Sequence, residues 1–387
     1  MRPRIAIIAE KYGGIGGSER FVKEVTERLA ATGKYEFHVF ANRWEAGRPD
    51  IVFHKVPRIK FPRFLRPWFF TAMAQRMIAR GGFDLVHSHW PTFKADVFST
   101  HGCPHAYWVK HVLKRRPNLF DRVMMMIDRR MIAGGANTVF MPVSAFLKER
   151  FKEVFGALPG DWQVVHPGVD AERFAHEPKA RAEIRAKHGI GADEFVVLFV
   201  GMNFGPKGLA PLMQGFAEFR RRQPAKPARL LVVGRGPVPE FQRRAAMLGI
   251  GKDVIFAGPQ ATGIERYYSA ADVFALLSEF ETFGMVVLEA MAAGLPVVIS
   301  DRMGVRDLVS DGVNGFVVGT TQLVEACASQ LARLLHEGAR RTMGEASRRT
   351  AQEHAWDRVA ADVVDMYWKR SRHSLTRGSE LHEGPYS

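Results

Sequence analysis

Two glutamates separated by seven residues frame a segment of the sequence that could bind a polyhydroxylated ligand. The segment reads "SEFETFGMVVLEAMAAGLPVV" over residues 278–298, with Glu281 and Glu289 on either side of a Phe-Gly turn. The apolar run "VFALLS" predicts a strand before Glu281, and the small and apolar residues after Gly284 predict a helix. A carboxylate can accept hydrogen bonds from two hydroxyl groups at once, so each glutamate suits a sugar diol.

The helix predicted after Gly284 would also offer unpaired backbone amides to an anion. The first N–H groups of a helix have no partner inside it, and in a parallel sheet such a helix end lies at the carboxyl edge, where ligands bind. If a diphosphate rests on the amides of residues 283–286, one glutamate could hold sugar hydroxyls and the other ribose hydroxyls. The alternative is that both glutamates only complement the helix dipole or pair with surface arginines.

Two further glycine-rich turns follow predicted strands. "GGIGGSE" near the start would let the backbone around Gly16 and Gly17 approach an anion, although an ordinary tight turn is the alternative. Glu19 stands where a dinucleotide fingerprint needs its third glycine, so this motif does not predict a dinucleotide site. In "GMNFGPKG", the ammonium of Lys207 is suited to neutralise a diphosphate as a point charge.

Alternating strands and helices predict two domains that position these turns. The chain of 387 residues is long for one core, and both halves alternate short apolar strands with amphipathic helices. This pattern favours an α/β fold of two doubly wound, Rossmann-like domains with parallel sheets. We predict domains over residues 1–168 and 169–355, a helix over 356–370 that returns to the first domain, and a flexible tail over 371–387. Ser18 is the expected N-cap of the first helix.

Bulk composition indicates a reducing compartment and an anionic partner. Two cysteines cannot form a disulfide framework, and 16 methionines would be vulnerable to oxidation outside the cell. The opening run "IAIIA" is too short for a signal peptide, and no apolar run reaches the length of a membrane-spanning helix. The net charge of +15 favours nucleic acid, an anionic membrane surface or a phosphorylated substrate.

Two segments of the first half combine this positive charge with aromatic residues. Residues 55–80 and 105–133 each interleave Lys and Arg with Trp, Phe or Tyr, which suits an anionic membrane interface. The expected membrane-facing residues are Trp68, Phe69, Trp108, Lys114, Arg115 and Arg116. A solvated basic face is the alternative, and because no nucleic-acid-binding motif accompanies the segments, no nucleic acid is expected as a partner.

Several histidines come from two neighbouring predicted strand ends. His87 and His89 would point to one side of their strand, and with His101, Cys103 and His105 they make a zinc site conceivable. Their spacing matches no structural zinc pattern. A hydrogen-bonded core role for His87 or His89 is the simpler interpretation.

Taken together, the motifs resemble the large retaining glycosyltransferase family four, which has the GT-B fold and uses nucleotide-sugar donors. The resemblance rests on the E-x7-E block "ETFGMVVLEAMAAGLPVV", on "VGMNFGPKG" and on "GGIGGSERFVKEVTERLA", and it covers nearly the whole chain in order. It implies that the two Rossmann-like domains face a cleft, with an acceptor-binding domain first and a donor-binding domain second. The branch looks closest to lipopolysaccharide core enzymes that glucosylate a heptose.

The resemblance also implies roles for particular residues. Lys207 would bind the diphosphate, Glu281 the transferred sugar and Glu289 the ribose. His101 would lie near the reacting carbon, so Glu281, His101 and Lys207 are the expected catalytic residues. The expected donor-binding residues are Gly16, Gly17, Asn203, Lys207, Glu281, Phe283, Gly284, Met285, Val286 and Glu289. Met202 stands where many members have an arginine, which would leave the diphosphate with one charge fewer.

The sequence therefore predicts a cytoplasmic, membrane-peripheral retaining hexosyltransferase. The hypothesis is transfer of glucose from UDP-glucose to the lipopolysaccharide core or another lipid-linked glycan at the inner face of the cell membrane. No cofactor is expected, and no metal, because the chain has no Asp-x-Asp pair. Retention would follow from same-face attack, and a covalent step is left open. The alternatives are a capsule, polyprenyl-linked or other glycolipid acceptor, and a sugar-nucleotide-binding protein without transfer activity.

Overall fold

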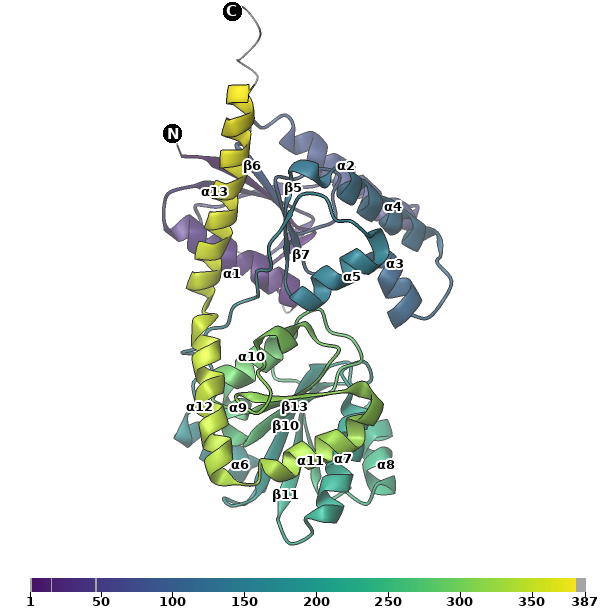
Figure 1. The fold of residues 1–387 in the computed structure, drawn as a ribbon, viewed down its shortest axis with the longest axis vertical. Helices are drawn as coiled ribbons and strands as arrows, with labels where there is room; N and C mark the ends of the chain where they lie inside the picture. Colours follow the sequence, from purple (N-terminus) through teal and green to yellow (C-terminus); the bar gives the residue numbers. More distant parts are fainter. Residues whose placement is uncertain (1, 15, 46, 381–387) are drawn as a thin grey trace, which may run out of the picture. The chain divides into compact units, whose positions relative to one another are not determined.

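The computed structural model describes residues 2–14, 16–45 and 47–380, which form two compact units (Figure 1). Unit 1 contains the chain up to Pro167 together with the helix that begins at Trp356, and unit 2 runs from Gly168 to Ala355. Each unit is built on its own parallel sheet flanked by helices. The predicted α/β class with two Rossmann-like domains is therefore confirmed.

The sheet of unit 1 has seven parallel strands in the order β5-β3-β1-β6-β7-β8-β9. Its strands are β1 Arg4–Ile8, β3 Glu36–Ala41, β5 Val52–Lys55, β6 Leu85–Ser88, β7 Val97–Thr100, β8 Val139–Pro142 and β9 Asp161–Trp162. A separate two-stranded ladder pairs β2 Lys11–Tyr12 with β4 Arg43–Trp44. The central strands are buried, as expected of continuous apolar runs covered on both faces.

Helices cover both faces of the unit 1 sheet. They are α1 Gly17–Ala31, α2 Arg66–Ile78, α3 His105–Tyr107, α4 Leu119–Ala133, α5 Ala145–Phe155 and α13 Trp356–Glu380. Figure 1 shows α1 and α13 on one side of the sheet and α2 and α4 on the other. The rings of Phe21 on α1 and Trp356 on α13 lie 5.8 Å apart, edge to face. The last helix is thus part of the core of unit 1.

The position of α2 is fixed by an apolar stripe. Phe70, Ala74 and Ile78 recur every four residues and pack in one core cluster with Ile8 of β1 and Phe40 of β3. Pro67 in the first turn suits a helix start, where the missing N–H would have no partner. This packing holds the first turn of α2 against the sheet.

Two local predictions in unit 1 were wrong. The first helix begins at Gly17 with Gly16 as its N-cap, and the Ser18 hydroxyl donates to the Glu19 carboxylate at 2.8 Å instead of capping. The predicted end of the last helix at residue 370 was also wrong, since α13 continues to Glu380; residues 371–380 contain no proline, the residue that disfavours a helix most. The remainder of the predicted flexible tail, residues 381–387, lies outside the described residues.

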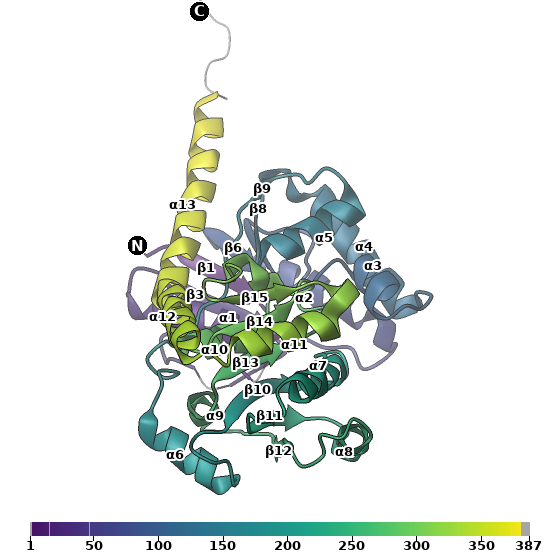
Figure 2. The ribbon, with the colours of Figure 1, turned by 60° about the horizontal axis from the view of Figure 1, so that its bottom comes forward.

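The sheet of unit 2 has six parallel strands in the order β12-β11-β10-β13-β14-β15. Its strands are β10 Phe195–Met202, β11 Ala228–Arg235, β12 Val254–Gly258, β13 Val273–Leu276, β14 Val297–Ser300 and β15 Gly315–Val318. Its helices are α6 Pro178–Lys187, α7 Leu209–Arg222, α8 Val238–Met247, α9 Glu265–Ala270, α10 Met285–Ala292, α11 Leu323–Arg333 and α12 Glu337–Glu353. Figure 2 shows α7 and α11 side by side against this sheet.

The strand order of each sheet reverses at one point. In unit 2 the chain moves from β10 outward to β11 and β12, then returns to β13 on the other side of β10 and continues to β14 and β15. In unit 1 the corresponding reversal lies between β1 and β6. Open α/β sheets bind ligands at the carboxyl ends of the strands beside such a reversal. In unit 2 this point lies between the turns that carry Lys207 and Glu281.

Candidate active site

The turns after β10 and β13 bring Lys207 and Glu281 together at the switch point of unit 2. Gly208 has a φ of 74°, and a Cβ there would lie 1.8 Å from the carbonyl oxygen of Leu277. Only glycine allows this close approach to the end of β13. The Lys207 ammonium forms an ion pair with a Glu281 carboxylate oxygen. Both side chains are sheltered, with exposed fractions of 28% and 18%, so the pair is less screened than a surface salt bridge.

The backbone of Glu281 is fixed by the neighbouring loop after β14. The Glu281 amide donates to the Arg302 carbonyl at 3.0 Å, and the Gly304 amide donates back to the Glu281 carbonyl at 2.9 Å. Two residues on, the Val305 amide donates to the Phe283 carbonyl at 2.9 Å. Because both sides of the loop are tied to the same neighbour, the carboxylate of Glu281 projects from a fixed backbone.

The helix α10 begins directly after this loop, with Gly284 as its N-cap at a φ of 105°. The amides of Met285 and Val286 therefore belong to the first turn, which lacks intrahelical partners. Glu289 lies one turn further on and is 7% exposed. The fully buried Tyr268 of α9 donates its hydroxyl to Glu289 at 2.8 Å, which orients the carboxylate. Lys207, Glu281, the start of α10 and Glu289 thus all belong to unit 2.

Sequence reasoning missed an arginine beside this group. Met202 at the end of β10 is paired in register with Arg235 at the end of β11, and the Arg235 side chain is exposed. Asn203 follows with a φ of 65°, and its amide donates to the Arg235 carbonyl at 2.7 Å. The signal that could have found Arg235 is the match between "LFVGM" and "LVVGR", two strand ends that align on their glycines. A cation therefore lies on the strand next to Met202.

In unit 1, Gly16 and Gly17 form the start of α1, and His101 follows β7. The His89 Nδ1 and His101 Nε2 atoms are 3.0 Å apart, and the ring of Phe21 packs edge-on against His101 with centroids 5.0 Å apart. These residues and the Lys207–Glu281 pair are in different units of the structure.

His87 has the hydrogen-bonded core role that the sequence favoured. It is fully buried, with the Tyr367 hydroxyl 2.8 Å from Nδ1 and the Ser99 hydroxyl 2.8 Å from Nε2. Burial and then the nearby His101 lower the pKa of His87 to about 3, and burial lowers the pKa of His101 to about 4. Both imidazoles are therefore neutral at pH 7. Among the residues that the structure describes, no group of three or more His, Cys, Asp or Glu side chains is arranged to hold a metal.

The expected membrane-facing residues differ in their availability. Trp68 and Trp108 are exposed, at 38% and 37%, whereas Phe69 is less exposed and half-buried. Lys114 and Arg116 are exposed, but the Arg115 guanidinium forms a bidentate pair with Asp121 at 2.6 and 3.1 Å. The positive charge of Arg115 is therefore matched within the protein.

Within the described part of the chain, no helix has the length and apolar character needed to cross a membrane. Large apolar side chains of unit 1 are nevertheless exposed, among them Phe61 of the basic and aromatic segment 55–80, which is 85% exposed.

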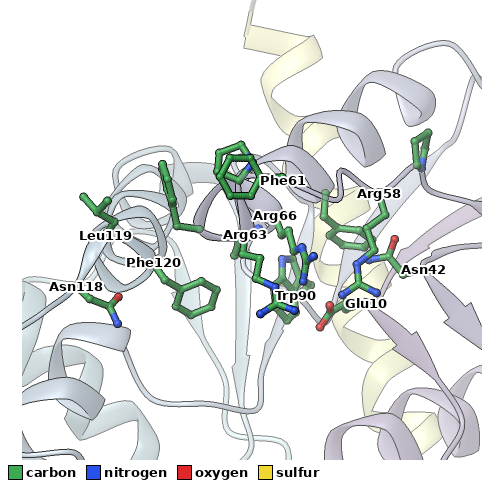
Figure 3. A pocket seen from close by; sticks show the side chains of 15 residues that line it. Glu10, Asn42, Arg58, Phe61, Arg63, Arg66, Trp90, Asn118, Leu119 and Phe120 are labelled. Atoms are coloured by element: carbon green, nitrogen blue, oxygen red, sulfur yellow. The ribbon is translucent and has the colours of Figure 1, made fainter.

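A pocket of about 710 Å³ opens in unit 1 between the first turns of α2 and α4 (Figure 3). Its polar lining residues are Glu10, Asn42, Arg58, Arg63, Arg66 and Asn118. Its aromatic lining residues are Phe61, Phe64, Phe70, Trp90 and Phe120. Sequence reasoning missed this pocket, because it interpreted the charge and aromatic content of residues 55–80 as a membrane-facing surface.

The two parallel-sheet units, with a lysine, a glutamate pair and a helix start at one switch point, define a GT-B glycosyltransferase. Residues 15–173 match the family described as Glycosyltransferase Family 4, and residues 180–350 match Glycosyl transferases group 1. The chain is 30% identical, over 95% of its length and 84% of the relative, to a D-inositol 3-phosphate glycosyltransferase of Salinispora tropica. The chain therefore belongs to the family four glycosyltransferases.

Two other similarities are informative. A GDP-mannose-dependent alpha-(1-6)-phosphatidylinositol monomannoside mannosyltransferase of Mycolicibacterium smegmatis is 36% identical over 61% of this chain and 63% of its own. The crystal structure of WaaG, a glycosyltransferase involved in lipopolysaccharide biosynthesis, superimposes with a TM-score of 0.77 at 23% identity, covering 94% of this chain and 99% of WaaG. At 23% identity, the similarity to WaaG is evidence for a shared fold only.

Proposed function

We propose that this glycosyltransferase transfers a hexose from a nucleoside-diphosphate sugar, with retention of configuration, to a lipid-linked glycan or glycolipid acceptor. The observation that carries the proposal is the Lys207–Glu281 pair beside the start of α10 at the switch point of unit 2. UDP-glucose is the donor of the primary hypothesis. GDP-mannose is the second candidate, because one relative is named for its dependence on that donor.

In the proposed mechanism, each part of the site meets one part of the donor. The Lys207 ammonium and the first amides of α10 stabilise the charge that develops on the departing diphosphate, a role that requires no metal. Glu281 leaves its ion pair to accept hydrogen bonds from the sugar. Glu289, oriented by Tyr268, accepts from the ribose hydroxyls.

Retention follows when the acceptor attacks the face from which the diphosphate leaves. The acceptor oxygen forms a bond to the anomeric carbon as the bond from that carbon to the phosphate oxygen breaks, and a phosphate oxygen takes the acceptor proton. His101 stays neutral at pH 7, because burial lowers its pKa to about 4, so it acts as a hydrogen-bonding group near the reacting carbon and not as a cation.

For the acceptor, the lipopolysaccharide core is the primary hypothesis, and capsule, polyprenyl-linked or other glycolipid acceptors are the alternatives. Relatives named for inositol 3-phosphate and for a phosphatidylinositol mannoside support an acceptor that carries a phosphate. We also propose that the chain binds the inner face of the cell membrane through Trp68, Trp108, Lys114 and Arg116. Neutralising Lys114 and Arg116 should then weaken co-sedimentation with anionic vesicles. If the wild type binds neutral and anionic vesicles equally well, this membrane proposal is contradicted.

The test of the activity is a thermal-shift and transfer screen over UDP-, GDP- and ADP-sugars. A donor that binds the folded protein raises its melting temperature by mass action. The wild type should bind and turn over at least one donor, and Glu281→Ala and Lys207→Ala should each lose transfer. Unchanged transfer in both variants would refute the site. Binding without transfer or hydrolysis across the panel would favour the alternative of a sugar-nucleotide-binding protein.

A further inference from the structure

Three arginines of the unit 1 pocket lack a matching negative charge. Arg58, Arg63 and Arg66 line the pocket, and Glu10 is its one carboxylate among the residues described. Within the same part of the chain, none of the three arginines forms an ion pair. Burial, together with the nearby charges of Arg58 and Arg63, lowers the pKa of Arg66. The pocket therefore concentrates positive charge that an anion would neutralise.

Three lining residues also hold buried polar atoms without a partner in the described structure. They are the Nε of Arg66, the Nε1 of Trp90 and the Oδ1 of Asn42. Buried polar groups are nearly always hydrogen-bonded, so each of these atoms would gain a partner if a bound ligand displaced the side chains that cover it. Two of them are donors, which suit phosphate oxygens, and the third is an acceptor, which suits a hydroxyl group.

The polar end of the pocket continues into a second cavity of about 250 Å³. Glu10, Asn42 and Arg58 line both cavities, and Lys11 and Arg43 line only the second. Figure 3 shows Glu10, Asn42 and Arg58 together at one end of the first pocket. A carboxylate and an amide beside cations are suited to the hydroxyls of a polyol that carries a phosphate.

The opposite end of the pocket is mainly apolar, with Asn118 as its polar residue. Figure 3 shows Leu119 and Phe120 there, across the pocket from Glu10 and Asn42, with Arg63 and Arg66 between the two ends. Phe61, Leu119 and Phe120 are 85%, 59% and 39% exposed, which is unusual for large apolar side chains gathered around one opening. An apolar group bound at this end would cover them.

We propose that this pocket binds the acceptor as a phosphate ester flanked by a polyol and an apolar chain. The phosphate lies among Arg58, Arg63 and Arg66, the polyol extends toward Glu10 and Asn42, and the chain packs on the apolar end. The assignment rests on the proposed function, since it takes unit 1 as the acceptor-binding domain. A phosphate ester could come from a lipid headgroup or from a soluble sugar phosphate, and the apolar end favours the lipid.

Calorimetry with three small probes on the full chain separates these elements. Dihexanoylphosphatidylglycerol, used below its critical micelle concentration, carries the polyol, the phosphate and the chains. Glycerol 3-phosphate lacks the chains, and octyl glucoside lacks the phosphate. We expect the phospholipid to bind most tightly, glycerol 3-phosphate more weakly, and octyl glucoside not to bind.

Arginine variants locate the binding. Arg63→Gln and Arg66→Gln should each raise the Kd of the phospholipid by roughly tenfold or more, because each removes a charge-assisted hydrogen bond to phosphate. Arg80→Gln is the matched control, since Arg80 is exposed in the turn that follows α2 and does not line the pocket. Arg63→Gln keeps the test valid if Arg66→Gln fails to fold, because Arg66 also donates to the Lys60 carbonyl at 2.7 Å.

The proposal is overturned if the phospholipid does not bind, if octyl glucoside binds as tightly as the phospholipid, or if the pocket variants bind like Arg80→Gln. Equal affinity for glycerol 3-phosphate and the phospholipid would overturn the apolar half and leave a soluble phosphate ester as the ligand. Binding of UDP and GDP, measured in the same variants, reports separately on the proposed function. If the wild type binds neither UDP nor GDP, the proposed function is contradicted, while the phospholipid titrations still report on the pocket.

Discussion

The ion pair between Lys207 and Glu281 predicts that two substitutions in one site change nucleotide affinity in opposite directions. Without donor the ammonium is held by Glu281, and a bound diphosphate must compete for it. Lys207→Ala removes a charge-assisted hydrogen bond of about 1.5–3 kcal/mol, which corresponds to a rise in the Kd of UDP or GDP of roughly 10- to 150-fold. Glu281→Gln frees the ammonium instead. For a pair with exposed fractions of 28% and 18%, we take about 1 kcal/mol, the upper end for exposed pairs, or roughly a fivefold fall in Kd.

Isothermal titration of the nucleoside diphosphate into both variants measures this difference. Lys252→Ala, which removes an exposed lysine elsewhere in unit 2, is the matched control and should bind like the wild type. Both site variants should lose transfer, because Glu281→Gln also removes a carboxylate expected at the sugar. If Glu281→Gln weakens nucleotide binding as much as Lys207→Ala does, the two side chains do not compete in this way and the reasoning is refuted.

Three further predictions concern Tyr268 and Arg235 of unit 2 and His87 of unit 1. Tyr268→Phe removes the hydroxyl that orients Glu289, so steady-state kinetics should show a several-fold higher KM for the donor with a smaller change in kcat; a loss confined to kcat would contradict the ribose role. Arg235→Ala should raise the Kd of UDP or GDP by roughly threefold if Arg235 supplies the charge that Met202 lacks, and an unchanged Kd in calorimetry would exclude that role. The free energy of unfolding should fall as the pH drops from 6.5 toward 3, because the unfolded chain takes up protons while buried His87, with its pKa lowered to about 3, stays neutral. In chemical denaturation, His87→Gln should flatten this dependence by up to about 1.4 kcal/mol per pH unit, and an identical slope would contradict it.

Much of the architecture was predictable because parallel strands buried on both faces leave a strong signal. The runs "FVVLFVG" and "RLLVVG" are continuously apolar, and they lie within the buried strands β10 and β11. Nearly every side chain of such a strand is buried, so the whole segment is apolar and can be recognised from its own residues. The first helix was harder, because Gly16 caps it through its extended backbone and offers no side chain that could mark the boundary.

The candidate site was predictable where chemistry follows directly from a local motif. The E-x7-E spacing indicated one glutamate before α10 and one in its second turn, and both lie there. The pairing of Lys207 with Glu281 could not be read from the sequence, because the residues are 74 positions apart and meet only through the order of β10 and β13. Arg235 was missed for the same reason, since its position beside Met202 depends on strand register.

Counting charges along the sequence could not distinguish arginines on an open surface from arginines that line a pocket in unit 1. Residues 55–80 looked like a basic membrane-facing surface, yet Arg58, Arg63 and Arg66 line a pocket that residues distant in the sequence complete, among them Glu10 and Phe120. Arg115 looked equally available and is paired with Asp121. Which cations are free depends on side-chain packing between segments, and a linear pattern carries no information about it.

The most direct test of the central claim is a crystal structure of the protein with UDP or GDP bound. The account predicts the diphosphate on the Lys207 ammonium and the first amides of α10, the ribose hydroxyls on Glu289, and the Lys207–Glu281 pair opened. A nucleotide bound elsewhere, or bound here with that ion pair intact and no contact between Lys207 and phosphate, would contradict it.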